Sequence, residues 1–240
     1  MAQYRLAHYL ALCGIASRRQ CSRIIEASRV TINGCLALHS TVIDTDFIDD
    51  IRVDDVKVLK PEDKVYWLYH KPVGVDCRLI ESDPSSLLHH LPKGPRLYPA
   101  GRLDKDSRGL LLLTNDGQLT QRLMHPDFHH SKTYHVSVDK PFDELFLTTM
   151  AAGVTYHQAS QNVTTRACLV KSLASVQFEI LLTQGLNRQI RKMCQTLGYR
   201  VIDLKRVAIG EVELGDLPET KRRPLTAAEL SMLMQPIGVT

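Results

Sequence analysis

Four consecutive leucines, Leu110–Leu113, stand between Gly109 and the turn-forming residues Asn115–Gly117. A short, purely apolar run bounded by turn residues is typical of a buried strand. The residues just before it are polar and charged, and they include Asp104 and Asp106. The pattern predicts a charged loop held at the edge of a core strand, a position where loops often carry function.

The first sixty residues predict two short helices followed by a strand. Apolar residues recur at helical spacing over residues 6–13, and Gly14 is a natural stop for that helix. Ser17 is a suitable N-cap for a second helix. Val30–Ile32 then predicts a strand, and Asn33–Gly34 is typical of a tight turn after it.

Beyond a charged, proline-containing linker at residues 60–63, apolar and alternating runs predict a larger sheet domain. We expect strands at residues 65–70, 110–113, 132–138, 154–157, 163–170, 175–182, 201–209 and 212–214, and a loop over residues 82–99. We expect helices at residues 119–124, at 227–234 after Thr226, from Pro141 to Gly153, and from a cap at Asn187 to Gly198. Many strands with few, separate helices favour the α+β class.

Composition places the chain among ordinary globular proteins, with 44% hydrophobic and 23% charged residues in 240. Its length suffices for one large domain, or for a small and a medium one. Six cysteines without a CxxC pair indicate reduced, intracellular thiols. The apolar run at residues 9–16 is too short and too interrupted for a secretory or membrane segment, so we expect a cytoplasmic protein without a membrane partner.

The net charge of +4 is small, but the basic residues are clustered at two places. Residues 1–31 contain five arginines against Glu26, and residues 185–206 contain six bases against Asp203. Clustered arginines on a small module indicate contact with a phosphate backbone, although a solvated helix face remains the alternative. In the predicted helix after Asn187, the spacing brings Arg188, Arg191 and Lys192 to one face.

The Asp-x-Asp pattern at Asp104 and Asp106 has several chemical interpretations. A calcium loop of the EF-hand type would need an oxygen ligand where Arg108 stands and Glu where Asn115 stands. A phosphotransferase aspartate would follow a hydrophobic strand, whereas here the strand comes after the loop. A structural ion network of the two carboxylates with Arg102, Lys105 and Arg108 remains open.

The histidines do not predict a metal site. They form two groups without Cys or Glu at a familiar ligand spacing: His89 and His90, and His125, His129 and His130. The sequence contains no Walker loop and no dinucleotide-binding glycine pattern, so we expect neither a metal nor a cofactor.

Four segments together resemble the RsuA-type pseudouridine synthases. GRLDKDSRGLLLLTNDG (101–117) is similar to the catalytic loop of the family, KTYHVSV (132–138) to its tyrosine strand, and QGLNRQIRKMCQTLGY (184–199) to its third motif. The Leu-Asn-Arg form of that motif resembles most the RluF-like branch, which acts on large-subunit ribosomal RNA. Residues 5–37 resemble an S4-type RNA-binding module, but acidic residues at 44–55 replace the usual Pro-Gly-Asp turn.

The resemblance implies an S4-like α/β RNA-binding domain at residues 1–62. A catalytic domain at 63–240 follows, built on a mixed, mainly antiparallel sheet with flanking helices. It implies isomerisation of a uridine in ribosomal RNA, most closely 23S, to pseudouridine, with the N1 bond broken and the base rejoined through C5. Asp104 is the expected nucleophile, Tyr134 the residue beside the target base, and Arg191 the basic partner packed against the nucleophile. Asp106 is expected to shape the loop.

The same resemblance, together with the basic clusters, predicts the RNA contacts and the partner. The target base is expected to be turned out of its stack into the site. The residues expected to meet RNA are Arg5, Ser17, Arg18, Arg19, Arg23, Arg102, Arg108, Arg188 and Lys192. We expect a monomer acting on ribosomal RNA, with transfer RNA left open as a second substrate. The alternative function is that of an RNA-binding or ribosome-assembly protein with an inactive synthase-like domain.

Overall fold

The computed structural model describes residues 3–44, 50–125, 130–158 and 160–235. His129 and the middle of the acidic segment therefore lie outside the described residues. The chain divides into two compact units: Met1–Val65 with Lys93–Leu97, and Tyr66–Pro92 with Tyr98–Thr240. No helix within the described ranges is long and apolar enough to cross a membrane.

The first unit confirms the predicted order of two helices and a strand. Its elements are β1 (Gln3–Arg5), α1 (Leu6–Leu12), α2 (Arg18–Glu26), β2 (Val30–Ile32), β3 (Cys35–Leu36), β4 (Val42–Asp44), β5 (Ile51–Val53) and β6 (Val56–Lys57). Four of the strands form a sheet in the order β3-β2-β5-β6, and β1 pairs with β4. Asn33 and Gly34 both have positive φ, 49° and 78°, which is the geometry of a tight hairpin turn.

Ser17 caps α2, as predicted from the sequence. Its hydroxyl accepts a hydrogen bond from the Gln20 backbone N–H at 3.3 Å, and Gln20 Oε1 accepts from the Ser17 N–H at 3.1 Å. This reciprocal capping box satisfies two donors that a helix start would otherwise leave free. Leu6, Leu10 and Ile25 then bury the inner faces of the two helices in the core of the unit.

The second unit contains the large sheet. Its elements are β7 (Tyr66–Lys71), a 3-10 turn (Leu87–His90), β8 (Tyr98–Pro99), β9 (Arg108–Thr114), α3 (Gly117–Met124), β10 (Lys132–Val138), α4 (Glu144–Ala152), β11 (Thr155–Gln158), β12 (Gln161–Thr164), β13 (Leu169–Ala174), β14 (Gln177–Leu182), α5 (Gln189–Thr196), β15 (Val201–Ile209), β16 (Val212–Glu213), β17 (Arg222–Pro224) and α6 (Ala227–Met234). The main strand order is β13-β14-β10-β15-β9-β7-β17.

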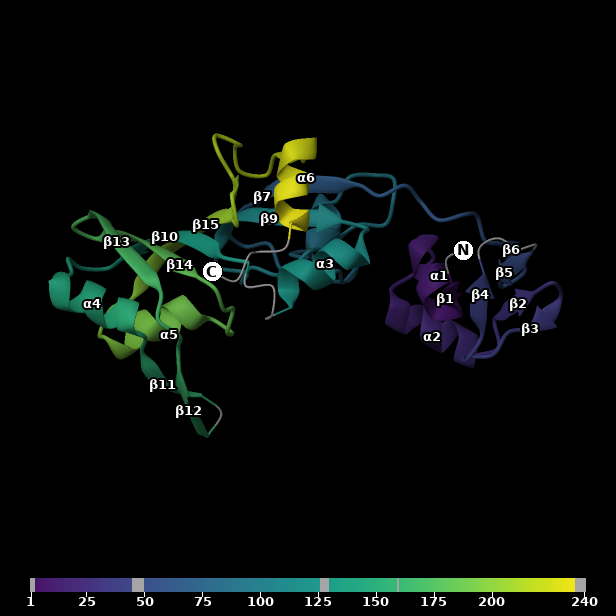
Figure 1. Ribbon diagram of the computed structural model, residues 1–240, viewed down its shortest axis with the longest axis horizontal. Coiled ribbons are helices and arrows are strands. Elements are labelled where there is room, and N and C mark those ends of the chain that lie inside the picture. Colours follow the sequence, from purple (N-terminus) through teal and green to yellow (C-terminus); the bar gives the residue numbers. More distant parts are fainter. Residues whose placement is uncertain (1–2, 45–49, 126–129, 159, 236–240) are drawn as a thin grey trace. The chain divides into compact units, whose positions relative to one another are not determined.

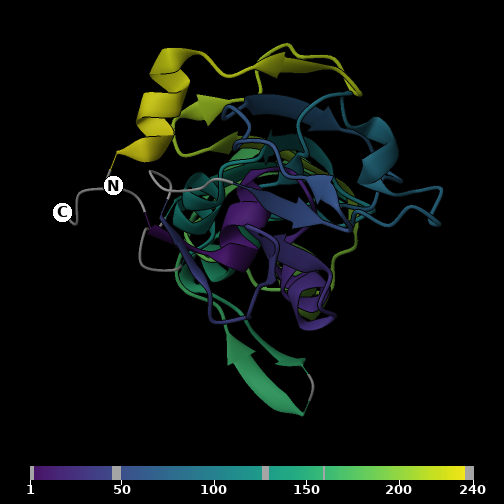
Figure 2. The ribbon, with the colours of Figure 1, turned by 90° about the vertical axis from the view of Figure 1, so that its right-hand side faces the viewer.

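The sheet is mixed and mainly antiparallel, so the predicted α+β class is confirmed. Only the β15–β9 pair is parallel among the pairings that join these strands. Helices α4 and α5 lie beside the β13–β14–β10 half, and α3 and α6 beside the β9–β7 half (Figure 1). The hairpin β11–β12 projects from the unit in both views (Figures 1 and 2).

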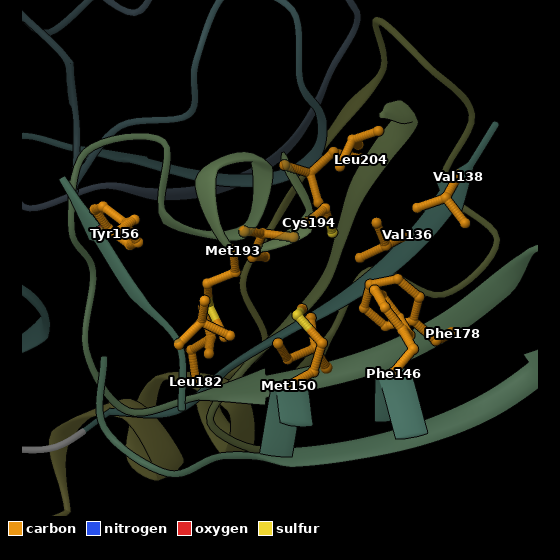
Figure 3. Close-up of a cluster of buried hydrophobic side chains, with 14 residues drawn as sticks. Val136, Val138, Phe146, Met150, Tyr156, Phe178, Leu182, Met193, Cys194 and Leu204 are labelled. Carbon is orange, nitrogen blue, oxygen red and sulfur yellow. The ribbon is translucent and has the colours of Figure 1, made fainter. Parts of the chain in front are cut away.

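A core of apolar side chains fills the space between the sheet and the helices α4 and α5. Phe146 and Met150 of α4 and Met193 of α5 meet Phe178 and Val136 of the strands (Figure 3). Phe146 and Phe178 meet edge to face, with ring centroids 5.4 Å apart. Such contacts fix how α5 lies on the sheet, and α5 begins at the functional site.

Strand β9 is the buried leucine strand that the sequence predicts. Leu110, Leu111, Leu112 and Leu113 are each at most 1% exposed. Gly109 lies where β9 passes alongside β15, and its φ is +112°. A Cβ atom at Gly109 would stand 2.2 Å from the Arg206 carbonyl oxygen, so only glycine allows the two backbones to approach this closely.

Several boundaries differ from the sequence prediction. Helix α4 begins after Asp143 and not at Pro141, because the Asp143 carboxylate accepts a hydrogen bond from Phe146 N–H at 2.9 Å. The predicted strand at 163–170 divides into β12 and β13, because Thr165 turns back to bond the backbone of Val154. Strand β17 was missed; it is three residues long and pairs with β7.

Candidate active site

The second unit contains a pocket of about 530 Å³. Its floor is one face of the sheet, because Lys132 and Tyr134 of β10 and Leu204 and Arg206 of β15 follow the two-residue period of strands. The walls are the loop 101–105 and the segment 184–190. The same face of β10 continues past Tyr134 to Val136 and Val138, which belong to the core shown in Figure 3.

The loop before β9 places Asp104 in this pocket. The side chain of Asp104 is 31% exposed, and its backbone carbonyl accepts a hydrogen bond from Ser107 N–H at 3.0 Å. The Lys105 carbonyl accepts from Gly74 N–H at 2.8 Å, which ties the loop to the segment after β7. Backbone contacts therefore fix the loop on both sides of the carboxylate.

Asp106 is the residue through which two arginines hold the loop. Arg188 donates two hydrogen bonds to its carboxylate, from Nη1 at 2.9 Å and from Nη2 at 2.8 Å. Arg191 Nε lies 3.3 Å from Asp106 Oδ2, an ion pair without hydrogen-bond alignment. The hydrogen bonds from Arg188 and the charge of Arg191 lower the pKa of the Asp106 carboxyl, and partial burial opposes them.

The two arginines differ from their predicted positions relative to Asp104. Arg191 was expected to pack against Asp104, but its Nη2 donates to the Asp106 carbonyl at 2.7 Å and to Ser107 Oγ at 3.4 Å. The ion pair to Asp104 comes from Arg188, with Nη1 3.8 Å from Oδ2. Arg191 thus fixes the loop backbone, and Arg188 brings the positive charge nearest to Asp104 among the described ion pairs.

Arg188 itself precedes helix α5 in a left-handed backbone conformation, with φ 53° and ψ 33°. It takes the N-cap position that the sequence assigned to Asn187, and it makes no side-chain cap. A non-glycine residue in this conformation stores strain, which often marks a functional position. The turn directs the Arg188 guanidinium to Asp106, a contact that the helical spacing of the sequence did not predict.

The side chains of the three bases around α5 point to different partners, although the sequence predicted one shared helix face; their contact with RNA stays a prediction. Lys192 Nζ turns to β11, where it donates to Gln158 Oε1 at 2.6 Å, and it also donates to the Asn187 carbonyl at 2.8 Å. It lies 5.6 Å from the centre of the Tyr156 ring. Arg188 and Arg191 face the loop instead.

The arginines that flank Asp104 in sequence have different surroundings. Arg102 is exposed and lines the pocket. Arg108 does not line it, because its guanidinium is paired with Asp203 at 2.7 Å and with Glu219 at 2.9 Å. Two carboxylates therefore already neutralise Arg108 in this structure, and its contact with a phosphate stays a prediction.

Three buried or half-buried cations near the loop are not among the site residues predicted from the sequence. Lys71 is fully buried, and its ammonium donates to the carbonyls of Val75 at 2.8 Å and Pro72 at 3.0 Å. Burial lowers the pKa of Lys71. Lys132 and Arg206 lie on the pocket floor. For Lys132 a signal existed, since it stands two residues before Tyr134 on the same face of a strand.

In the first unit, the arginines expected to meet RNA are exposed. They are Arg5, Arg18, Arg19 and Arg23. Ser17, expected among the same contacts, uses its hydroxyl to cap α2. Arg29 of the same unit forms an ion pair with Asp54, so its charge is already neutralised.

The part of the chain that the structure describes contains no cluster of metal-binding side chains. There, no three His, Cys, Asp or Glu side chains come together in a group that could hold a metal ion. The pocket itself presents carboxylate, phenol, ammonium and guanidinium groups.

Comparison with known proteins agrees with this geometry. Residues 65–196 match the family model described as RNA pseudouridylate synthase. The dual-specificity RNA pseudouridine synthase RluF of Escherichia coli is 37% identical over 94% of this chain and 77% of its own length. The ribosomal large subunit pseudouridine synthase B of Bacillus subtilis is 33% identical over 95% of each chain.

A solved structure extends the similarity to the fold. The crystal structure of a pseudouridylate synthase covers 96% of this chain and 99% of its own, with a TM-score of 0.70 and 30% identity. The family model spans more than half of the sequence and includes both the Asp104 loop and Arg191. This chain belongs to the RNA pseudouridylate synthase family.

Proposed function

We propose that this chain converts one uridine of large-subunit (23S) ribosomal RNA to pseudouridine, without a cofactor. The observation that carries the proposal is the pocket in which Asp104 lies above a floor containing Tyr134. The Bacillus subtilis relative is named as a ribosomal large subunit enzyme, which supports this substrate. The Escherichia coli relative is named as dual-specificity, so transfer RNA is included in the test.

In this proposal Asp104 is the nucleophile toward the target nucleotide. A carboxylate attack splits a difficult rearrangement into easier steps. Attack at the ribose C1′ or at the base C6 is compatible with the position of Asp104 in the pocket. Arg188, 3.8 Å away, supplies positive charge beside the carboxylate. The contacts of Asp106 with Arg188 and Arg191 keep the loop in a geometry prepared for the reaction.

Tyr134 is proposed to contact the target base on the pocket floor. A uracil inside folded RNA is reached only when the nucleotide turns out of its stack. The exposed Arg102 at the pocket, and the exposed arginines of the S4-like first unit, are proposed to hold the flanking phosphates. We propose that the protein acts in the cytoplasm as a monomer.

The competing proposal is an RNA-binding or assembly protein with an inactive domain. Tritium release distinguishes them, because rejoining through C5 expels the hydrogen of that carbon. RNA labelled with [5-³H]uridine is incubated with the protein, using 23S RNA, 16S RNA and transfer RNA in separate reactions. We expect release of about one tritium equivalent from 23S RNA; binding of all three RNAs without release from any would favour the assembly protein.

Replacing Asp106 by asparagine should slow isomerisation by about 100-fold, because a loop misplaced by an ångström or so loses that much rate. The change removes the negative charge that Arg188 and Arg191 share, so both arginines hold the loop less firmly, although asparagine has the size of aspartate. Single-turnover tritium release measures the effect. The matched control is Asp203→Asn, which removes one of the two carboxylates paired with Arg108, outside the pocket, and should leave the rate within about threefold. Equal rates for the two variants would remove the proposed role of Asp106.

RNA affinity should fall about 100-fold between 50 and 200 mM salt if about five cationic contacts release counterions. The double variant Arg18→Ala, Arg19→Ala should make the slope of log affinity against log salt shallower by about 1.5. Filter binding or fluorescence anisotropy measures this slope. Arg29→Ala is the control, because Asp54 already neutralises that arginine. A salt response that the double variant leaves unchanged would exclude the first unit from phosphate contact.

A further inference from the structure

Arg206 presents a buried cation that the proposed mechanism leaves unused. It is only 2% exposed, and its Nε donates to the Leu110 carbonyl at 2.8 Å. Its Nη2 is buried without a hydrogen-bond partner among the described residues. An unsatisfied buried nitrogen costs free energy, and such a group requires an explanation. Because Arg206 lines the pocket, a ligand in the pocket is the natural source of the missing acceptor.

Lys132 lies close to Arg206 on the same floor. Its ammonium donates one hydrogen bond, to the His130 carbonyl at 2.9 Å, and an ammonium carries three protons. Burial and the Arg206 charge lower the pKa of Lys132 to about 8. Neither cation forms an ion pair with a carboxylate in the described part of the chain. Two neighbouring cations that have no carboxylate partner among the described residues are arranged for a ligand that brings negative charge.

The position of the two cations relative to Tyr134 suggests which part of a nucleotide they meet. Arg206 pairs with Tyr134 in the β10–β15 register, and Lys132 stands two residues along β10. Apolar Leu182, Leu204 and Ile209 surround them on the floor. A floor that is apolar except for two hydrogen-bond donors suits the flat face and carbonyl edge of a base better than a phosphate, which prefers many donors.

The isomerisation produces negative charge on that carbonyl edge. If Asp104 bonds to C1′, the electron pair of the broken N1–C1′ bond stays on the uracil and spreads to O2 and O4. If Asp104 bonds to C6, the electrons of the C5–C6 double bond move toward O4. Each route therefore increases the charge of a carbonyl oxygen before the base rejoins through C5 and loses the C5 proton.

We propose that Lys132 and Arg206 bind the carbonyl edge of the target uracil and stabilise the negative charge that develops on it. The inference rests on the proposed function and adds to it the residues that act on the base and not on the ribose. Donors fixed in a water-poor site act most strongly where charge develops in the transition state. Asp104 would then attack from the wall of the pocket, while the two cations on the floor stabilise the negative charge on the carbonyl oxygens of the base.

The test compares Lys132→Met with Lys205→Met under single-turnover conditions at saturating protein. Lys205 lies on β15 next to Arg206 but lines a separate hollow with Arg108, so it matches the charge change outside the pocket. We expect Lys132→Met to slow tritium release by about 100-fold, the effect of removing one such donor. RNA affinity and the melting temperature should stay near those of the wild type, and Lys205→Met should react normally.

A second measurement detects charge stabilisation specifically. When the target uridine is replaced by 5-fluorouridine, the electron-withdrawing fluorine disperses charge within the ring. Lys132→Met should therefore slow the loss of intact 5-fluorouridine by a smaller factor than it slows the isomerisation of uridine. Lys132→Arg, which keeps the charge, should recover most of the activity. If Lys132 had only a structural role, the ratio of the wild-type rate to the Lys132→Met rate would be the same for uridine and 5-fluorouridine.

The outcomes separate the two levels of the proposal. If the wild type releases no tritium from any RNA, the proposed function fails. If the wild type is active and Lys132→Met is equally active, the inference about the floor is wrong. Lys132→Met could instead weaken RNA binding and reduce the dependence of affinity on salt, while the rate of tritium release at saturating protein stays unchanged. That result would show that the floor binds a phosphate, and the inference would again be wrong.

Discussion

Replacing Asp104 by asparagine should abolish pseudouridine formation, reducing the rate by at least about 10⁴-fold, as loss of a nucleophile does in other enzymes. Asparagine keeps the size of the side chain, so the loop should retain its backbone contacts to Gly74 and Ser107. RNA binding should persist, because one carboxylate in the pocket contributes no phosphate contact. Tritium release at saturating protein, with affinity measured in parallel, checks both expectations.

The comparison with Asp106→Asn makes the Asp104 result specific. The two variants make the same chemical change two residues apart, one at the proposed nucleophile and the other at the residue that Arg188 and Arg191 hold. We expect complete loss at Asp104 and partial loss at Asp106. Normal turnover by Asp104→Asn would exclude this carboxylate from the chemistry, and the reverse order of the effects would exchange the two roles.

Gly109→Ala should unfold or severely destabilise the second unit, by more than about 4 kcal/mol, because such values arise when a core cannot accommodate an added group. The new Cβ would stand 2.2 Å from the Arg206 carbonyl oxygen and 2.6 Å from its nitrogen. Both contacts are to backbone, so no side chain can move aside. The parallel β9–β15 pairing would have to open, and the Asp104 loop would no longer be anchored to a paired strand.

Gly74→Ala is the matched control for that prediction. Gly74 also has a positive φ, 91°, but no heavy atom of the described residues, apart from its chain neighbours, lies within 4 Å of an added Cβ. It should therefore show only conformational strain, on the order of 1 kcal/mol. Denaturant unfolding of the two variants measures the difference. Equal midpoints would show that close approach to β15 does not determine the need for glycine at 109.

The sequence predicted best where local pattern and tertiary structure agree. The leucine run became β9 because a short apolar stretch is stable only when both faces are covered, and KTYHVSV became β10 with the predicted bounds. The caps at Ser17 and Thr226 were predictable because a capping box is local. The pocket position of Asp104 followed from its place at the edge of a core strand.

Long-range pairings could not be predicted in the same way. Helical spacing placed Arg188 on the face of Arg191 and Lys192, but its left-handed backbone turns the guanidinium to Asp106, 82 residues earlier. Arg108 stands beside the loop in sequence, yet Asp203 and Glu219 neutralise it. The burial of Arg206 depends on strands that only the sheet brings together, so counting it among the six clustered bases could not reveal it.

We propose that this chain isomerises one uridine in large-subunit ribosomal RNA and that Asp104 performs the reaction. Carbodiimide treatment followed by primer extension maps pseudouridine directly, using unmodified 23S RNA incubated with the protein and buffer alone. We expect one new stop at a single uridine with the wild type and no stop with Asp104→Asn. A map without any new stop, or the same stop with both proteins, would contradict it.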